Sequence, residues 1–122
     1  MISIDVNERV ERACAYFKEG YNCAQAVAMA YNDIMDMRVE EVAKITAPFG
    51  GGMGRMREVC GTVSGMTLLA GAIKPAVNPQ NLEERKENYA LVQHFAEQFR
   101  AENGDIVCRR LLGLEPMVER AE

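Results

Sequence analysis

A glycine-dense stretch that leads into an apolar segment constrains the fold of this chain more than any other feature. Residues 49–65 read FGGGMGRMREVCGTVSG, so a loop rich in glycine runs into a predicted helix that carries Cys60. Gly61, Gly65 and Gly71 all fall inside that helix. Glycine costs a helix about 1 kcal/mol relative to alanine, and close approach of another backbone is the natural reason for it. We therefore expect Cys60 to lie where helices pack unusually close together.

Helix-capping pairs and the spacing of apolar residues predict a compact, single-domain, all-α bundle of about five or six helices over residues 1–122, with the glycine-rich loop before its central helix. No alternation of β-branched and polar residues predicts a strand. Glycine and proline mark the helix ends. The first expected helix begins after Asp5 and ends near Gly20. The next four run from Cys23 through Ile34, from Val39 to Ala47, from about Cys60 to Ile73 and from Asn81 to Gly104. The last is short and is capped by Asp105, with Cys108 as its third residue.

Two of these helices carry apolar stripes that we expect to face the core. Cys14 lies on the first stripe, and we interpret it as a core residue, as free cysteine often is. The only histidine, His94, lies opposite the second stripe, so we expect it to face solvent without pairing with a thiol. The stripes consist of Val6, Val10, Ala13, Cys14 and Phe17 on the first helix, and of Tyr89, Val92, Phe95, Ala96 and Phe99 on the longest.

The charge of the chain and the lengths of its apolar runs exclude two classes of partner. The formal net charge is -4 and no basic run exceeds Arg109–Arg110, whereas nucleic-acid binders usually present a net basic surface. The longest nearly apolar run, residues 66–73, is far shorter than the roughly 20 residues that span a bilayer. Charged residues among the first ten argue against a signal peptide. We therefore expect a soluble, cytoplasmic protein with neither nucleic acid nor a membrane as partner.

Three of the four cysteines share a setting that favours a reactive thiol. In a reducing compartment, cysteines are more often catalytic, redox-sensing or metal-bound than disulfide-bonded. Cys23 and Cys108 fall in the first turn of predicted helices, where the helix dipole should lower the thiol pKa below about 8.5. Arginines precede Cys60 and follow Cys108, and their charge should act in the same direction. The candidate functional residues are therefore Cys23, Cys60 and Cys108.

The glycine-rich loop does not fit a phosphate-binding motif. Gly50, Gly51, Gly52 and Gly54 are not followed by Gly-Lys-Ser/Thr, and no predicted strand precedes them. Both the P-loop and the dinucleotide-binding fingerprints therefore fail. We interpret the loop as a structural turn.

Three segments carry a resemblance to a known family. Residues 19–27 read EGYNCAQAV, residues 49–65 contain the glycines and the run Cys-Gly-Thr-Val-Ser-Gly, and residues 104–113 read GDIVCRRLLG. In this order and spacing they resemble the C_GCAxxG_C_C family of putative redox-active proteins. Members of that family are small and helical, carry four cysteines and a Cys-Gly-Ala-x-x-Gly motif, and tend to be associated with oxidoreductase or transporter systems. The resemblance implies that Cys23, Cys60 and Cys108 are functional thiols and that Gly61 and Gly65 serve helix packing.

Two positions depart from the family pattern. Thr62 stands where the motif has alanine, which is a mild change. The fourth family cysteine is missing, because no cysteine follows Cys108, and Cys14 in the first helix does not match its position. This departure weighs against any mechanism that needs two dithiol pairs or four thiolates from one chain.

Three functions are compatible with these residues. The first is thiol–disulfide redox chemistry, in which Cys60 pairs with Cys23, with Cys108 or with both. The second is binding of an iron–sulfur cluster or another metal by the same thiolates, although such clusters ordinarily use four. The third is a non-catalytic helical interaction module. The expected partner is an unidentified redox protein or oxidoreductase, and the sequence specifies neither a cofactor nor an oligomeric state.

Overall fold

The computed structural model describes residues 4–114, in which six α-helices and one 3₁₀ turn follow one another along the chain. The all-α prediction is confirmed for this part of the protein. Its only pairing of extended segments is an isolated antiparallel bridge between Val59 and Val107. The helices are α1 (Val6–Lys18), α2 (Cys23–Met29), α3 (Val39–Thr46), α4 (Gly61–Ile73), α5 (Leu82–Asn103) and α6 (Cys108–Leu111), and the 3₁₀ turn η1 (Ala47–Phe49) follows α3.

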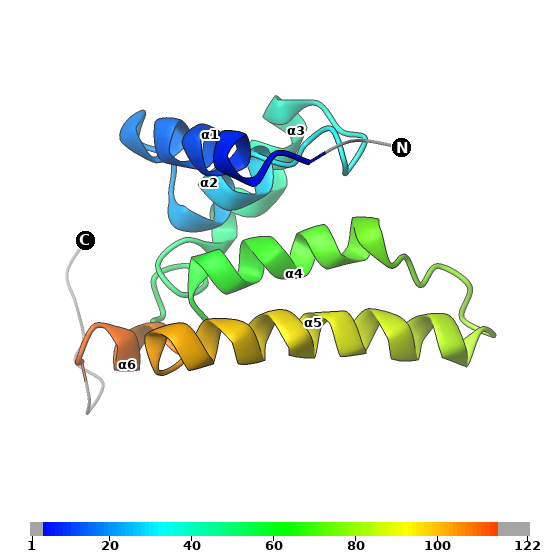
Figure 1. Ribbon diagram of the computed structural model, residues 1–122. Helices are drawn as coiled ribbons and strands as arrows, with labels where there is room; N and C mark the ends of the chain where they lie inside the picture. The colour runs from blue at the N-terminus through cyan, green and yellow to red at the C-terminus, as the bar shows by residue number, and fades with distance from the viewer. Residues whose placement is uncertain (1–3, 115–122) are drawn as a thin grey trace.

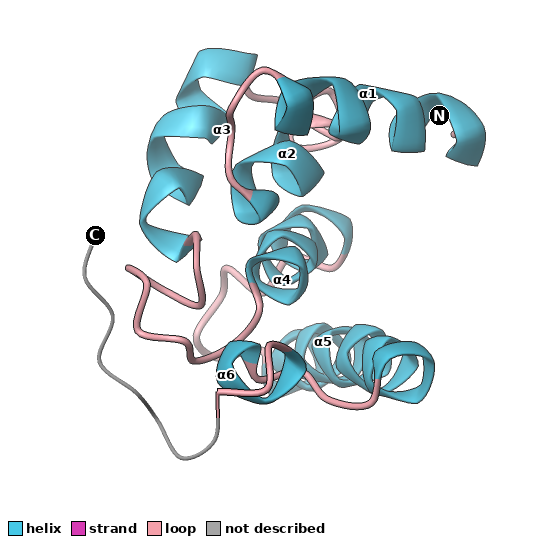
Figure 2. Ribbon diagram, turned by 90° about the vertical axis from the view of Figure 1, so that its left-hand side faces the viewer, coloured by secondary structure: helices cyan, strands magenta, loops and turns pink. Residues whose placement is uncertain are grey.

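Helix α4 lies at the centre of the molecule. On one side it packs against α2, and on the other it runs alongside α5, so that α1, α2 and α3 form one layer, α4 a second and α5 a third (Figure 1). Figure 2 shows the same order of layers after a turn of 90°. The prediction of a central helix after the glycine-rich loop is therefore confirmed.

The small buried core lies around α2 and is built largely of alanine. Met29 at the end of α2 packs against Val42 of α3, and both side chains are almost completely buried. Short side chains on α2 let α1, α3 and α4 all approach its backbone. The buried alanines are Ala24, Ala26 and Ala28 within the helix and Ala30 just after it.

The predicted start of α2 is confirmed, and its predicted end is wrong. The Asn22 side chain accepts the Gln25 amide at 2.9 Å, and the Gln25 side chain accepts the Asn22 amide at 3.1 Å. Cys23 is the first helical residue, as predicted. The helix ends at Met29, short of the predicted Ile34, because a side chain from α1 captures the next carbonyl group.

That side chain is Arg9, the buried residue of α1. Its guanidinium donates to the Ala30 carbonyl at 2.8 Å, the oxygen that would accept the Ile34 amide if α2 continued. It also forms a two-fold ion pair with Asp33, at 2.5 and 2.8 Å, and lies 5.1 Å from the ring centre of Tyr31. Arg9 thus fixes α1 against the end of α2 and prevents α2 from extending.

The apolar stripe predicted to bury α1 faces solvent instead. Val6, Val10 and Phe17 are each more than half exposed, and Cys14 is exposed as well. The side of α1 that packs is the one with Arg9, whose aliphatic stem and charged head serve both apolar and polar neighbours. The interpretation of Cys14 as a core residue is therefore wrong.

Two of the three glycines predicted to allow close helix packing do so. A Cβ atom at Gly61 would lie 3.0 Å from the Ala24 amide nitrogen, and one at Gly65 would lie 3.0 Å from the Ala24 carbonyl oxygen. The backbones of α4 and α2 therefore cross at Ala24 with no room for a side chain on α4. At Gly71 nothing lies within 4 Å of such an atom, so the prediction is wrong there. Cys60 is the N-cap residue of α4, ahead of the helix and not within it.

Helix α3 has nearly the predicted bounds, and proline shapes its end. Val39–Thr46 is helical, and the chain then tightens into η1, with Pro48 in its first turn. Proline lacks a backbone donor and cannot continue an α-helix. The turn delivers the chain to the glycine-rich loop beside the start of α2.

Helix α5 is long and lies on the surface. None of its residues is fully buried. Tyr89 of the predicted stripe is 58% exposed, whereas Val92, Phe95 and Phe99 are half-buried on the side of α4. The expected core stripe is therefore only partly covered. His94 is exposed, as predicted.

Both ends of α5 are held by side chains or backbone geometry. Asn81 caps its start by accepting the Glu84 amide at 3.1 Å, as predicted. The Asn88 side chain donates to the Lys74 carbonyl at the end of α4, at 2.9 Å. Gly104 ends the helix with a φ of 96°, in the left-handed region that glycine favours.

In the described part of the chain, no helix is both long enough and apolar enough to cross a membrane.

Candidate functional site

Each of the three candidate cysteines lies at the beginning of a helix. Cys23 is the first residue of α2, Cys60 is the N-cap residue of α4, and Cys108 is the first residue of α6. The three helix starts come from distant parts of the sequence. Two separate contacts bring them together.

The first contact pairs the backbones of the segments that carry Cys60 and Cys108. The Cys60 amide donates to the Ile106 carbonyl at 2.8 Å, and the Cys108 amide donates to the Glu58 carbonyl at 2.5 Å. These two hydrogen bonds flank the isolated antiparallel bridge. The pairing places the start of α6 beside the start of α4.

The start of α6 differs from the prediction, because Asp105 forms a turn ahead of it. The Asp105 side chain accepts the amides of Ile106 and Val107 at 2.8 and 3.0 Å. Val107 is therefore the N-cap, and Cys108 is the first helical residue instead of the third. Hydrogen bonding from the Val107 amide lowers the pKa of the Asp105 carboxyl group, so the turn is held by a charged acceptor.

The second contact is the crossing of α2 and α4, which brings Cys23 to the same place. A Cβ atom at Gly61, the neighbour of Cys60, would lie 3.4 Å from the Cys23 Cβ atom. One residue further, the side chain of Thr62 lies near enough to Cys23 to lower the pKa of its thiol. The first turn of α4 therefore lies directly against Cys23.

The electrostatic environment of Cys23 links the three thiols. Partial burial of its sulfur raises the pKa of Cys23 above the ordinary value, and the thiols of Cys60 and, less strongly, Cys108 raise it further. Hydrogen bonds from its own backbone amide and from Thr62 act in the opposite direction. The expected lowering of the Cys23 pKa is therefore wrong, because burial and two like groups outweigh the effect of the helix start.

Cys108 is buried, and an arginine contacts its sulfur. The Arg57 Nη1 donates to the Cys108 Sγ at 3.8 Å. The Arg57 Nε is buried and has no hydrogen-bond partner among residues 4–114. Gly52 leaves the necessary room, since a Cβ atom there would lie 2.8 Å from the Cys108 Cβ. Arg57 thus approaches Cys108, although in the sequence it precedes Cys60.

The glycine-rich loop forms a turn, as predicted, and its own backbone closes it. The amides of Gly54 and Arg55 donate to the carbonyls of Pro48 and Gly50 at 2.7 and 3.1 Å. Arg55 and Arg57 have φ values of 63° and 61°. This left-handed conformation costs a non-glycine residue roughly 1–2 kcal/mol. The loop therefore holds both arginines in a conformation that they would not adopt on their own.

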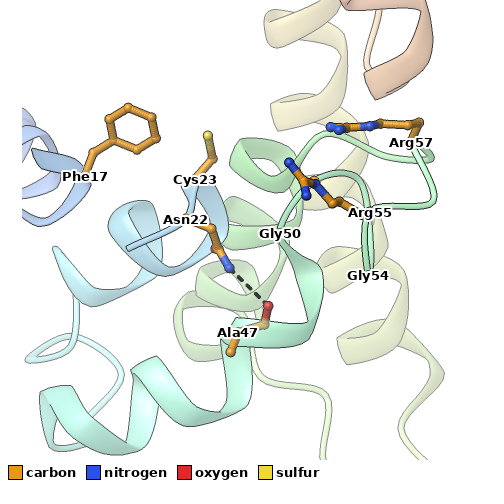
Figure 3. Close-up of a pocket in the computed structure, with 9 residues that line it drawn as sticks. Phe17, Asn22, Cys23, Ala47, Gly50, Gly54, Arg55 and Arg57 are labelled. Carbon is orange, nitrogen blue, oxygen red and sulfur yellow. Dashed lines mark hydrogen bonds between the residues drawn. The ribbon is translucent and has the colours of Figure 1, made fainter. Parts of the chain in front are cut away.

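An open pocket of about 650 Å³ lies between Cys23 and this loop. Figure 3 shows Phe17 on one side of Cys23 and the guanidinium groups of Arg55 and Arg57 on the other. The glycines of the loop form part of the wall, so that wall carries few side chains. The pocket combines an exposed thiol, an aromatic ring and two cationic groups.

Three residues that the sequence did not single out as functional help to form the site. Asn22 was identified only as a helix cap, but its side chain also donates to the Ala47 carbonyl at 3.0 Å and ties α2 to η1. Phe17 was assigned to the core, and Thr62 only to a variable motif position. The position of Thr62 next to the Cys-Gly motif is the one signal that could have identified it.

Cys14 does not lie with the paired segments of Cys60 and Cys108. It is exposed on α1 and borders a smaller, mostly apolar pocket of about 280 Å³, which Cys23 and Thr62 also line. It therefore approaches Cys23 only across this pocket. The structure gives no reason to place Cys14 in the position of the missing family cysteine.

The three thiols are not arranged as a metal site. Within residues 4–114, no group of three or more His, Cys, Asp or Glu side chains is placed to hold a metal ion. Structural zinc and iron–sulfur sites ordinarily use four such ligands. The donor set of residues 4–114 therefore does not fit the metal-binding alternative.

Comparison with known proteins agrees with the resemblance seen in the sequence. The family model for C_GCAxxG_C_C, described as putative redox-active protein, matches residues 21–122. The matched region contains Cys23, Cys60 and Cys108. No curated protein and no solved structure matches the chain. The chain therefore belongs to the C_GCAxxG_C_C family of putative redox-active proteins.

Proposed function

We propose that this protein carries out thiol–disulfide exchange, with Cys23 and Cys60 as the reacting pair and Cys108 as a further thiol beside them. The observation that supports this most directly is the meeting of the three helix starts: a Cβ atom at Gly61, next to Cys60, would lie 3.4 Å from the Cys23 Cβ atom, and the bridge between Val59 and Val107 places Cys108 beside Cys60. The electrostatic effect of Cys60 and, less strongly, of Cys108 on the pKa of Cys23 agrees with this arrangement. All four cysteines are free in the structure.

Exposure divides the roles among the three thiols. Cys23 is exposed and borders the large pocket, so an incoming disulfide reaches it first, even though its raised pKa reduces the fraction present as thiolate. Cys60 is half-buried and is the stronger electrostatic neighbour of Cys23, which suits a resolving thiol. Cys108 is buried, and its sulfur is in contact with Arg57.

The reaction consists of two exchange steps. The Cys23 thiolate attacks one sulfur of a substrate disulfide, which forms a mixed disulfide and releases one substrate thiolate that takes up a proton. The Cys60 thiolate then attacks the Cys23 sulfur, which forms the Cys23–Cys60 disulfide and releases the second substrate thiol. The protein gives up two electrons and two protons, and these convert the substrate disulfide into two thiols.

Disulfide mapping after controlled oxidation tests this proposal. Reduced protein is mixed with bis(hydroxyethyl) disulfide, quenched with acid, alkylated and digested for mass spectrometry. We expect the loss of two thiols per chain and a cross-link between Cys23 and Cys60. In the Cys60→Ser variant the reaction should stop at a mixed disulfide on Cys23. Cys14→Ser is the matched control and should leave the cross-link unchanged.

Two outcomes would contradict the proposal. One is that Cys23→Ser, Cys60→Ser and Cys108→Ser each keep the wild-type exchange rate and lose the same number of thiols on oxidation as wild type. The other is that every cysteine of the native protein resists alkylation, which would favour the helical interaction module.

A further inference from the structure

We infer that the pocket beside Cys23 selects small disulfides that carry carboxylate groups, which Arg55 and Arg57 hold while Cys23 attacks the sulfur–sulfur bond. This inference rests on the proposed thiol–disulfide exchange and assigns it a class of substrate. The pocket measures about 650 Å³. That volume lies within the roughly 300–1,000 Å³ typical of small-molecule sites.

The charge of the pocket indicates an anionic ligand. Arg55 and Arg57 both line it. Arg57 also contacts the Cys108 sulfur through Nη1, at 3.8 Å. A carboxylate in the pocket would pair with the guanidinium groups that border it.

The arginines serve the pocket and not the thiol of Cys23. The largest contributions to the pKa of Cys23 come from burial, from the other two thiols and from hydrogen bonds. In Figure 3 the guanidinium groups lie across the pocket from the Cys23 sulfur. Their cationic groups are therefore separated from the thiol by the space that a ligand would fill.

The loop presents these two arginines in a fixed arrangement. Arg55 and Arg57 are both held in the left-handed backbone conformation. Their amides donate to the carbonyls of Gly50 and Gly51 at 3.1 and 3.2 Å. Strain of this kind persists where the surrounding structure enforces it, and it clusters at binding sites. The fixed backbone directs both side chains from the loop to the same pocket, where planar guanidinium groups match the geometry of a carboxylate.

The pocket matches the two ends of such a substrate. One carboxylate meets Arg55 and Arg57, the sulfur–sulfur bond meets Cys23, and the exposed ring of Phe17, on the other side of Cys23, borders the second half of the molecule. A neutral disulfide would gain only the contact with the ring. A cationic disulfide would be repelled by both arginines.

Three disulfides of similar length and different charge test the inference. They are dithiodipropionate with two carboxylates, bis(hydroxyethyl) disulfide with none, and cystamine with two ammonium groups. The exchange rate of each with reduced protein is divided by its rate with a small free thiol. We expect the dicarboxylate to react about tenfold faster than the neutral disulfide, as for one charge-assisted hydrogen bond, and cystamine to be slowest. High salt should reduce the preference in the wild-type protein.

Variants of the two arginines identify the source of the preference. Arg55→Gln and Arg57→Gln should each lower it, and Arg57→Lys should keep part of it because the charge remains. Arg12→Gln is the matched control, because Arg12 is an exposed arginine on α1 outside the pocket. Alkylation of Cys23 by iodoacetate and by iodoacetamide gives a second ratio that does not depend on disulfide exchange. Relative to the same ratio for a small free thiol, iodoacetate, the anion, should react faster with the wild-type protein and lose this advantage in the glutamine variants.

The outcomes separate failure of the inference from failure of the function. Equal normalised rates for all three disulfides, with exchange still dependent on Cys23, overturn the carboxylate preference and leave the exchange function intact. Absence of Cys23-dependent exchange with every disulfide overturns the function, and the substrate assignment fails with it. A preference that survives both glutamine substitutions and high salt also overturns the role of the arginines.

Discussion

The crossing of α2 and α4 and the layer formed by α5 are built in opposite ways. At the crossing, backbone lies on backbone, because Ala24 is fully buried and Gly61 and Gly65 leave no room for a side chain. Along α5, the longest helix of the described chain, no residue is fully buried. The length of a helix therefore does not indicate where this fold is tightly packed.

The difference has a direct bearing on the thiols. Cys23 and Cys60 sit at the crossing, at the starts of the two helices whose backbones meet there. Their separation depends on contacts that tolerate no added volume. Helix α5 contributes no thiol and has side-chain contacts that can be trimmed. Substitutions at the crossing should therefore disturb both the fold and the site, and those on α5 should disturb neither strongly.

The largest effect is expected for Gly65→Val. The new side chain would meet the Ala24 carbonyl oxygen and the Val27 Cβ atom, which lie 3.0 and 3.1 Å from the position of a Cβ atom. Overpacking against backbone should lower the free energy of unfolding by about 3 kcal/mol in urea titrations. Gly71→Ala on the same helix is the control and should raise it by about 0.5–1 kcal/mol, since that position is open. Equal effects at the two glycines would contradict the tight crossing.

A smaller loss is expected for Arg9→Leu, which removes the ion pair at the end of α2. Arg9 is 5% exposed, and its partner Asp33 is 38% exposed, so the pair is only partly shielded from water. We expect a loss of about 2 kcal/mol in the same titrations, below the range for a fully buried pair. Arg12→Leu, which removes the exposed pair with Glu8, should cost less than about 0.5 kcal/mol. Equal losses in the two variants would show that burial of Arg9 does not matter.

The same ion pair makes stability depend on pH in the acid range. Hydrogen bonding and attraction from Arg9 lower the pKa of Asp33 from 3.8 to about 2. The stabilisation is therefore complete above about pH 4 and is lost as the pH falls through about 2. The difference in Tm between wild type and Asp33→Asn should shrink over that interval. A constant difference from pH 7 to pH 2 would contradict the assignment.

The smallest effect is expected on α5. Phe95 is half-buried, so Phe95→Ala should cost about 1 kcal/mol, well below the value for a fully buried phenylalanine. Tyr89→Ala, at a position that is 58% exposed, should cost less than about 0.5 kcal/mol. Urea titrations of both variants measure this. A loss at Phe95 as large as that at Gly65 would remove the contrast between the two regions.

Local signals in the sequence predicted the helix boundaries best. Asp5, Asn22 and Asn81 cap their helices as predicted, because a cap involves only residues two or three positions apart. Gly104 likewise ends α5 by its own backbone conformation. The all-α fold followed from these signals and from the helical spacing of apolar residues.

Features that depend on distant residues were mispredicted. The apolar stripe of α1 pointed to the wrong face, because the ion pair between Arg9 and Asp33 joins segments that no local pattern connects. The pKa of Cys23 was expected to fall from its place at a helix start, whereas burial and the thiols of Cys60 and Cys108 raise it. The sequence identified the residues of the candidate site, and only the fold defines their environment.

The antiparallel bridge has a mechanical consequence for the α4–α5 hairpin. The hairpin is joined at one end by the turn that Asn88 and Lys74 close, and at the other by the pairing of residues 58–60 with 106–108. The two helices are thus joined at both ends. Because both of its ends are held, α5 stays beside α4 although none of its residues is fully buried. It thereby places the start of α6 next to the start of α4. The backbone pairing of residues 58–60 with 106–108, and not the packing of α5, sets the distance between Cys60 and Cys108.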